Sequence, residues 1–142
     1  MNFYHKIPVQ IRFNDLDPAR HVNNAIYAEY FDLGKVSYFR EVTGQPLNFD
    51  GLSLVVAGYR IDFFQPVFAD EEIEVSTKVH VLGTKSLELL QHICLKGDDN
   101  PRAVSSTTMV CFNYSEQQSE PIPEEWKNLI RNFEHYECRD KA

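Results

Sequence analysis

Strict alternation of apolar and polar residues in the second half of the chain constrains the fold more than any other feature. Side chains of a strand point to opposite faces in turn, so this period of two predicts strands over residues 73–81, 87–95 and 103–114. Turn signals separate these strands, one at Gly83 and the next in the run that starts at Gly97. Because short turns join antiparallel neighbours, the three strands are expected to form an antiparallel meander.

The first half of the chain combines one long helix with two more strand patterns. Residues 24–42 are rich in helix formers and carry aromatic side chains at helical spacing, and Gly44 is a suitable stop. Apolar residues occupy more than one stripe of this helix, so it is expected to be surrounded. Strands are predicted over 7–13 and 54–64. The first should begin near Pro8 or lie at an edge, because proline lacks a backbone donor.

The order of these elements favours one packing. A strand, a long helix, four strands and a short helix after Pro121 predict an α+β fold, in which a five-stranded antiparallel sheet wraps the long central helix. The chain has 142 residues and no long linker, so 1–142 is expected to be a single domain. One sheet with one long helix leaves other surfaces to be covered, which favours a homodimer or a homotetramer.

Composition and charge argue against several classes of function. The 14 Lys and Arg residues face 21 Asp and Glu, and the net charge of −7 argues against nucleic-acid binding and mildly against docking of an acidic acyl carrier protein. The N-terminus lacks a signal-peptide pattern, and no apolar run approaches the length of a membrane span. The cysteines are odd in number and widely spaced, which favours reduced thiols and a cytoplasmic location; they are Cys94, Cys111 and Cys138.

Polar residues are concentrated in the turn that joins the first predicted strand to the long helix. Its sequence is D-L-D-P-A-R-H-V-N-N, and it carries Asp15, Asp17, His21, Asn23 and Asn24. A carboxylate can act as a base or a nucleophile, while a helix N-terminus offers unpaired N–H groups and the positive end of a dipole. This turn is therefore the candidate catalytic site.

Residues 14–38, which include this motif and the aromatic helix after it, resemble the hotdog-fold acyl-CoA thioesterases of the 4-hydroxybenzoyl-CoA thioesterase-like group. The later segments I-D-F-F-Q-P-V-F-A-D-E-E-I-E-V and G-T-K-S-L-E-L look like strands and a hairpin of that group. The predicted strand order also agrees with the hotdog fold. The resemblance extends over nearly the whole chain, and the turn motif is its most specific part.

The resemblance implies hydrolysis of a thioester with Asp17 as the catalytic carboxylate. Asp17 would act either as general base for a water or as a nucleophile that forms a mixed anhydride. The backbone N–H of Asn24 would bind the thioester oxygen. Without the surrounding motif, Asp17 would be equally consistent with a turn-former or a cap, because Asp before Pro is common in loops.

The neighbouring polar residues have structural interpretations beside the catalytic one. Asp15 is expected to hold the turn, and the side chains of Asn23 and Asn24 to satisfy the start of the helix. His21 is either an acid or base in the reaction or a structural histidine. Tyr27, one helical turn inside, is expected in the core or in the pocket wall. These residues are expected to support Asp17 more than to react themselves.

Three further residues bear on substrate binding. Lys85 and Ser86 follow a Gly-Thr turn, and similar pairs in the resembled group contact CoA phosphates; the alternative is a solvated hairpin tip. Arg20 departs from the group's pattern, which often has Gly before H-V-N-N. If this position needs a positive φ, Arg20 costs stability there. Alternatively, Arg20 reaches outward to a substrate or a neighbouring chain.

We therefore expect an acyl-CoA thioesterase that releases a free acid and CoA. The alternatives are an acyl-carrier-protein thioesterase and a non-catalytic acyl-binding hotdog protein. The CoA thioester would be the substrate, and no cofactor or metal is expected, because H-E-x-x-H and C-x-x-C are absent and the five histidines are scattered. The chain also lacks G-x-S-x-G and a glycine-rich phosphate loop, which argues against the common serine and nucleotide hydrolases.

Overall fold

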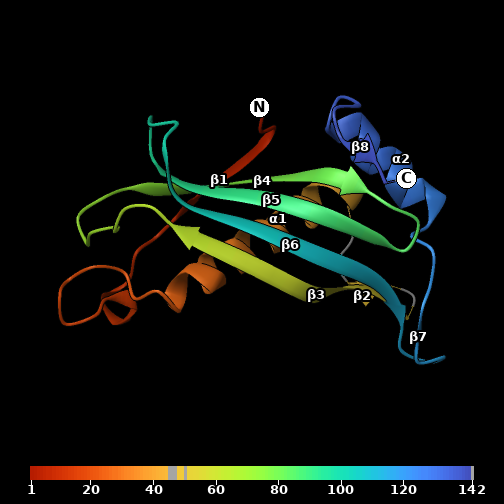
Figure 1. Ribbon diagram of the computed structural model, residues 1–142, viewed down its shortest axis with the longest axis horizontal. Coiled ribbons are helices and arrows are strands. Elements are labelled where there is room, and N and C mark those ends of the chain that lie inside the picture. Colours follow the sequence, from red (N-terminus) through yellow and green to blue (C-terminus); the bar gives the residue numbers. More distant parts are fainter. Residues whose placement is uncertain (45–47, 50, 142) are drawn as a thin grey trace.

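The computed structural model describes residues 1–44, 48–49 and 51–141 of the chain. Its main elements follow the predicted order, with short additions between them (Figure 1). In chain order they are β1 (His5–Val9), the 3-10 helix η1 (Phe13–Asp15), α1 (Ile26–Thr43), β2 (Asn48–Phe49), β3 (Leu52–Phe63), β4 (Ile73–Leu82), β5 (Ser86–Leu95), β6 (Pro101–Asn113), β7 (Gln118–Ser119), α2 (Glu124–Phe133) and β8 (Arg139–Asp140). No helix within these described ranges is long and apolar enough to cross a membrane.

The five principal strands form one antiparallel sheet in the order β1-β4-β5-β6-β3. The turns at Gly83 and Gly97 join antiparallel neighbours, which confirms the predicted meander. The short strands lie at the margins: β2 pairs with β3, β7 pairs with β6, and β8 runs parallel to β4. The sheet is therefore the one expected from the alternation, extended by three two-residue strands.

The first strand is shorter than the sequence pattern predicts. Val9 pairs with Ile73, which is the first residue of β4, so no strand of the described residues pairs with the segment beyond this point. It turns instead through η1, and the side chain of Phe13 is left 88% exposed. Pro8 lies within β1 at the edge of the sheet, where its missing N–H is tolerated.

α1 lies along one face of the sheet and buries a stripe of aromatic residues (Figure 1). The largest members of this stripe are Tyr27, Tyr30, Phe31, Tyr38 and Phe39. Gly34 belongs to the same stripe, at a point where a Cβ would lie only 2.7 Å from Cγ1 of Val75. The helix ends at Gly44, as predicted, because this residue has a left-handed φ of 69° and its N–H bonds the carbonyl of Arg40.

A second apolar stripe of α1 is uncovered, so the prediction of a surrounded helix is wrong for a single chain. Leu33 and Val36 are 54% and 42% exposed, because the sheet covers only one side of the helix. The edge of β3 is exposed as well. Residues 56–60 are all accessible, and within the described part of the chain no strand pairs with this edge beyond Ser53.

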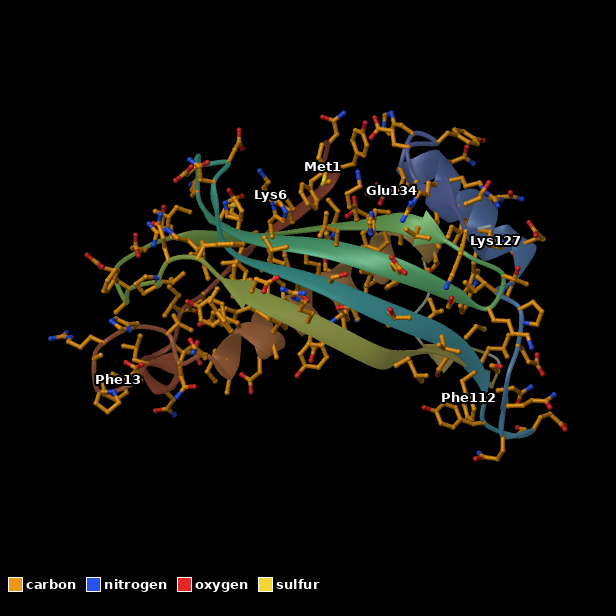
Figure 2. All side chains as sticks on the ribbon, viewed as in Figure 1. Met1, Lys6, Phe13, Phe112, Lys127 and Glu134 are labelled. Atoms are coloured by element: carbon orange, nitrogen blue, oxygen red, sulfur yellow. The ribbon has the colours of Figure 1, made fainter. Side chains whose placement is uncertain are left out.

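α2 closes the core at the C-terminal end of α1, with Trp126 and Ile130 facing inward. The buried carboxylate of Glu134 fixes the end of this helix, because its Oε2 accepts the hydroxyl of Tyr38 and the backbone N–H of Val79. Burial raises the pKa of Glu134. Figure 2 shows Glu134 at the α2 end of the molecule, opposite the end that carries the turn before α1.

Candidate active site

Backbone hydrogen bonds close the turn between η1 and α1. The N–H of Asp17 donates to the carbonyl of His21 at 2.9 Å, and the N–H of Arg20 donates to the carbonyl of Asp17 at 2.9 Å. The N–H of Asn23 donates to the carbonyl of Asp15 at 2.8 Å, which joins the two ends of the turn just before the helix. These local bonds fix much of the turn, and the N–H of Val22 ties it to the carbonyl of Val67 at 2.8 Å.

Arg20 adopts the left-handed backbone that the resembled pattern, with its frequent glycine, suggested for this position. Its φ is 67°. For an L-residue with a Cβ this conformation costs about 1 kcal/mol, because the Cβ approaches the following carbonyl oxygen. The hydrogen bond from its N–H to Asp17 helps to hold it there, while its side chain is exposed.

Asp17 presents one anchored and one free carboxylate oxygen. Oδ1 accepts the backbone N–H of Ala19 at 2.9 Å and that of His21 at 3.3 Å. Oδ2 accepts no hydrogen bond from any described residue, and Nδ1 of the His21 ring lies 3.9 Å from it. The Asp17 side chain is 30% exposed, so water reaches it. Anchoring fixes the orientation of the carboxylate and leaves Oδ2 with lone pairs for a proton or a carbon atom.

The start of α1 leaves one backbone donor free beside this turn. Oδ1 of Asn23 accepts the N–H of Ala25 at 3.0 Å, and the carbonyl of Asn23 accepts the N–H of Ile26 at 2.9 Å. The N–H of Asn24 has no acceptor among the residues that the structure describes. It belongs to a helix N-terminus, whose partial positive charge attracts anions. Such a donor can bind a developing oxyanion.

Asp15 connects the turn to α1 and is only 1% exposed. Its Oδ2 accepts the backbone N–H of Arg12 at 2.9 Å and the hydroxyl of Tyr30 at 2.6 Å. Burial, and next the bond to Asp15, raise the pKa of Tyr30, so this hydroxyl remains a donor. The structure thus places Asp15 beneath the turn as a structural acceptor, away from solvent.

His21 and Tyr27 both contact the segment between β3 and β4. His21 pairs with Phe68 through an isolated bridge, and the two rings meet edge to face with centroids 5.2 Å apart. Tyr27 is 2% exposed, its hydroxyl accepts the N–H of Val67 at 3.3 Å, and burial raises its pKa. Tyr27 is therefore a core residue behind the turn. The His21 side chain is 37% exposed and lies beside the Asp17 carboxylate.

A cavity of about 440 Å³ opens at Asp17. Its walls are Ile11, Arg12, Phe13, Leu16, Asp17, Arg20 and Ala69. They combine apolar surface with one carboxylate and two guanidinium groups. Within the described ranges, no three His, Cys, Asp or Glu side chains are grouped so that they could hold a metal ion.

Two residues of this arrangement carry no signal in the sequence. Arg12 falls on the polar face of the predicted first strand, where an exposed cation is ordinary. Tyr30 belongs to the aromatic pattern of α1. Its spacing predicts that it is buried, but does not predict that its hydroxyl donates to Asp15. Both roles depend on how the turn folds back onto the helix, which local spacing does not reveal.

Lys85 and Ser86 lie at the other end of the sheet from Asp17. Lys85 ends the connection between β4 and β5, and Ser86 is the first residue of β5; the carbonyl of Lys85 accepts the N–H of Cys111, and that of Ser86 accepts the N–H of Gly83. β4 contains 10 residues, which span about 30 Å in an extended strand. Figure 1 shows the turn before α1 and the β4–β5 connection at opposite ends of the sheet. One chain therefore does not bring Lys85 or Ser86 to Asp17.

The sequence of this chain is similar to those of known proteins. Residues 11–130 match the thioesterase-like superfamily, a stretch that contains the turn, α1 and the strands β3 to β6. The uncharacterized protein YsmA of Bacillus subtilis (strain 168) is 31% identical over 88 residues, or 62% of this chain. The matched stretch spans 58%, less than two thirds, of the length of that relative.

Solved structures share the fold. A thioesterase from Thermus thermophilus, complexed with coenzyme A and zinc, is 28% identical with a TM-score of 0.83, over 94% of this chain and 96% of that one. The PA5185 protein from Pseudomonas aeruginosa strain PAO1 is 24% identical with a TM-score of 0.84, over 99% of this chain and 94% of that one. The hotdog fold expected from the sequence is confirmed.

Proposed function

Because the chain belongs to the thioesterase-like superfamily, we propose that it is an acyl-CoA thioesterase, which hydrolyses the thioester of an acyl-CoA to a free acid and CoA. One observation carries this proposal: Oδ2 of Asp17 lies in the closed turn that leads directly to the N–H of Asn24 at the start of α1, and neither group is hydrogen-bonded to a residue that the structure describes. The coenzyme A bound to the similar thioesterase from Thermus thermophilus supports CoA as the carrier of the acyl group.

The turn and the helix start supply the two functions that thioester hydrolysis needs. The thioester oxygen binds the N–H of Asn24, and the positive end of α1 stabilises the charge that develops on it. Oδ2 of Asp17 either takes a proton from a water that attacks the carbonyl carbon, or attacks that carbon itself and forms a mixed anhydride that water cleaves. In both routes the C–S bond breaks, and CoA leaves as a thiolate that takes up a proton. The backbone N–H of His21 keeps Oδ1 in place meanwhile.

Asp17→Asn tests this proposal with little change of shape. The amide oxygen still accepts the N–H groups of Ala19 and His21, but the side chain can neither take a proton nor attack carbon. We expect kcat to fall about 1,000-fold on a good substrate. The substrate comes from a panel of short, medium, long and aromatic acyl-CoAs, with detection of the free thiol. Asp98→Asn is the matched control, because Oδ1 of Asp98 accepts the N–H of Asn100 in another turn.

Three results would count against the proposal, and they differ in what they indicate. Similar rates for wild type and Asp17→Asn on a good substrate would show that Asp17 is not the catalyst. Turnover of carrier-protein thioesters alone would indicate an acyl-carrier-protein thioesterase. Binding of acyl-CoAs without turnover of any would indicate a non-catalytic acyl-binding protein that has kept the fold.

The active unit in this proposal is a homodimer formed along the free edge of β3. A second copy would pair with residues 56–60 on the edge of β3 that faces away from β6, where the described part of the chain supplies no strand beyond Ser53. It would also cover exposed apolar side chains there, with Val56 45% and Tyr59 60% accessible. Unpaired strand edges are normally covered, blunted or joined to another chain. A homotetramer would need a second interface in addition.

A further inference from the structure

Two arginines line the Asp17 cavity, in a chain whose formal net charge is −7. The side chain of Arg12 is 68% exposed and lies 3.6 Å from Asp15 and 3.9 Å from Glu29, distances too long for hydrogen bonds. Arg20 forms no ion pair with any residue that the structure describes. Its guanidinium group is therefore available to a ligand.

The backbone gives no reason for an arginine at position 20. The left-handed φ of 67° favours glycine, which would adopt it without strain. The side chain of Arg20 is exposed, so it adds nothing to the packing of the core. A residue held in a strained conformation next to a reactive group points to a role for its side chain.

The charged side chains that line a hollow next to the Asp17 cavity are mostly acidic, and of these Glu71 is paired with Arg102. This hollow, of about 730 Å³, shares Ile11 and Ala69 with the Asp17 cavity. Its charged walls are Asp70, Glu71, Glu72, Glu74 and Lys96. A polyanionic ligand that reaches Asp17 is repelled from these carboxylates, and its negative groups are favoured on the side of Arg20.

We propose that Arg20 binds the phosphate groups of the CoA part of the substrate, with Arg12 as a second cation beside it. This inference rests on the proposed function. A planar guanidinium offers paired N–H donors that match phosphate oxygens, and such charge-assisted bonds are strong. Apolar walls at Ile11, Phe13 and Leu16 suit the uncharged arm that joins the thioester to the phosphates. Figure 2 shows Phe13 projecting from the loop at this end of the molecule.

The experiment compares two thioesters with the same acyl group: an acyl-CoA, and an acyl-N-acetylcysteamine that lacks phosphates. Arg20→Gly removes the guanidinium and relieves the left-handed strain, so the fold is kept. We expect KM for the acyl-CoA to rise about tenfold, which is the effect of one charge-assisted hydrogen bond. KM for the N-acetylcysteamine thioester should stay within about twofold, and the melting temperature should be equal or higher.

Two further variants make the comparison specific. Arg20→Lys keeps the charge without the planar fork, and it should restore part of the affinity for the acyl-CoA. Arg40→Ala is the matched control, because Arg40 is an exposed arginine in the last turn of α1, at the other end of the helix. It should leave KM for both thioesters as in wild type.

Several results would overturn the phosphate site. One is an equal change of KM for both thioesters with Arg20→Gly, or no change for either. Another is a KM for the acyl-CoA that responds to Lys85→Ala and not to Arg20→Gly. Titration with CoA itself separates this inference from the proposed function. If the wild type hydrolyses no substrate but binds CoA about tenfold more tightly than Arg20→Gly does, the proposed thioesterase activity is refuted and the phosphate site stands. Equal affinity, or no binding by either protein, refutes the site.

Discussion

At Gly34, α1 approaches the sheet so closely that a Cβ would have no room, and Gly34→Ala tests whether that approach holds the fold and the site together. An ideal Cβ on Gly34 would lie 2.7 Å from Cγ1 of Val75, 2.8 Å from Nε2 of Gln91 and 2.9 Å from Oγ1 of Thr77. All three distances are shorter than real Cβ atoms show. The helix must therefore move away from the sheet, or the three side chains must leave their positions.

The expected loss of stability follows from these contacts. Overpacking of this kind costs about 1–3 kcal/mol. Nε2 of Gln91 also donates to the carbonyl of Phe31 at 2.9 Å and to Oγ1 of Thr77 at 3.0 Å, and loss of one bond adds about 1 kcal/mol. The better helix propensity of Ala offsets roughly 1 kcal/mol. We expect the free energy of unfolding to fall by about 2 kcal/mol, and the melting temperature by about 8 °C.

The assay for Gly34→Ala is urea unfolding followed by the fluorescence of Trp126, the single tryptophan, which lies on the buried face of α2. Arg40→Ala is the control, because Arg40 is an exposed residue of the same helix, in its last turn. Its free energy of unfolding should stay within about 0.5 kcal/mol of wild type. The same shift of α1 would displace the N–H of Asn24, so kcat/KM of Gly34→Ala should fall as well, by up to about 100-fold.

Unchanged stability of Gly34→Ala would refute the reasoning, since it would mean that the core accepts a methyl group where the geometry leaves no room. A double variant sharpens the conclusion. Val75→Ala removes the nearest contact atom, so Gly34→Ala should cost less in its presence, with a coupling energy of at least about 0.5 kcal/mol. Additive effects of the two substitutions would show that the clash with Val75 is not the cause.

Two more predictions concern the proposed dimer and the response to pH. Tyr59→Lys places a charge on the free edge of β3, and in sedimentation it should change a mass of two chains to that of one; a wild type that sediments as a single chain would contradict the dimer. Burial lowers the pKa of His5 from its ordinary value of 6.5, only partly opposed by Glu41 at 3.4 Å. The unfolded chain then binds a proton that the folded protein does not, so His5 stabilises the fold above its unfolded pKa and loses this contribution as the pH falls. The free energy of unfolding should fall more steeply from about pH 7.5 to about pH 5 in wild type than in His5→Asn, measured with urea, and parallel curves would contradict the assignment.

Part of the turn could be predicted because its hydrogen bonds are local. The bonds from Ala19 and His21 to Asp17, and from Ala25 to Asn23, join residues two to four positions apart. Such short-range capping and turn bonds depend on residue type and spacing, which a sequence shows directly. The left-handed conformation of Arg20 belongs to the same class, since it is a property of one position in one turn.

The parts of the site that escaped prediction all involve contacts between distant residues. The hydroxyl of Tyr30, on α1, donates to Asp15, which lies 15 residues earlier in the chain. The ring of His21 contacts that of Phe68, which lies in the segment between β3 and β4. Periodicity assigns a residue to the buried face of an element without naming its partner. The uncovered stripe of α1 is a related case, because an apolar face can be buried by another copy as well as by the chain's own sheet.

The position of Lys85 follows from the order of the helices and strands, and the resemblance of its motif to a phosphate-binding pair does not reveal it. In an antiparallel fold, each long element takes the chain from one end of the sheet to the other. From Asp17 the chain crosses with α1, returns with β3, and crosses again with β4, so Lys85 must lie at the far end. By the same count the segment that contains Phe68, reached after two crossings, returns to the end that carries Asp17. A phosphate contact from Lys85 would therefore have to come from a second chain, whereas Arg20 lies in the same turn as Asp17, the proposed catalytic carboxylate.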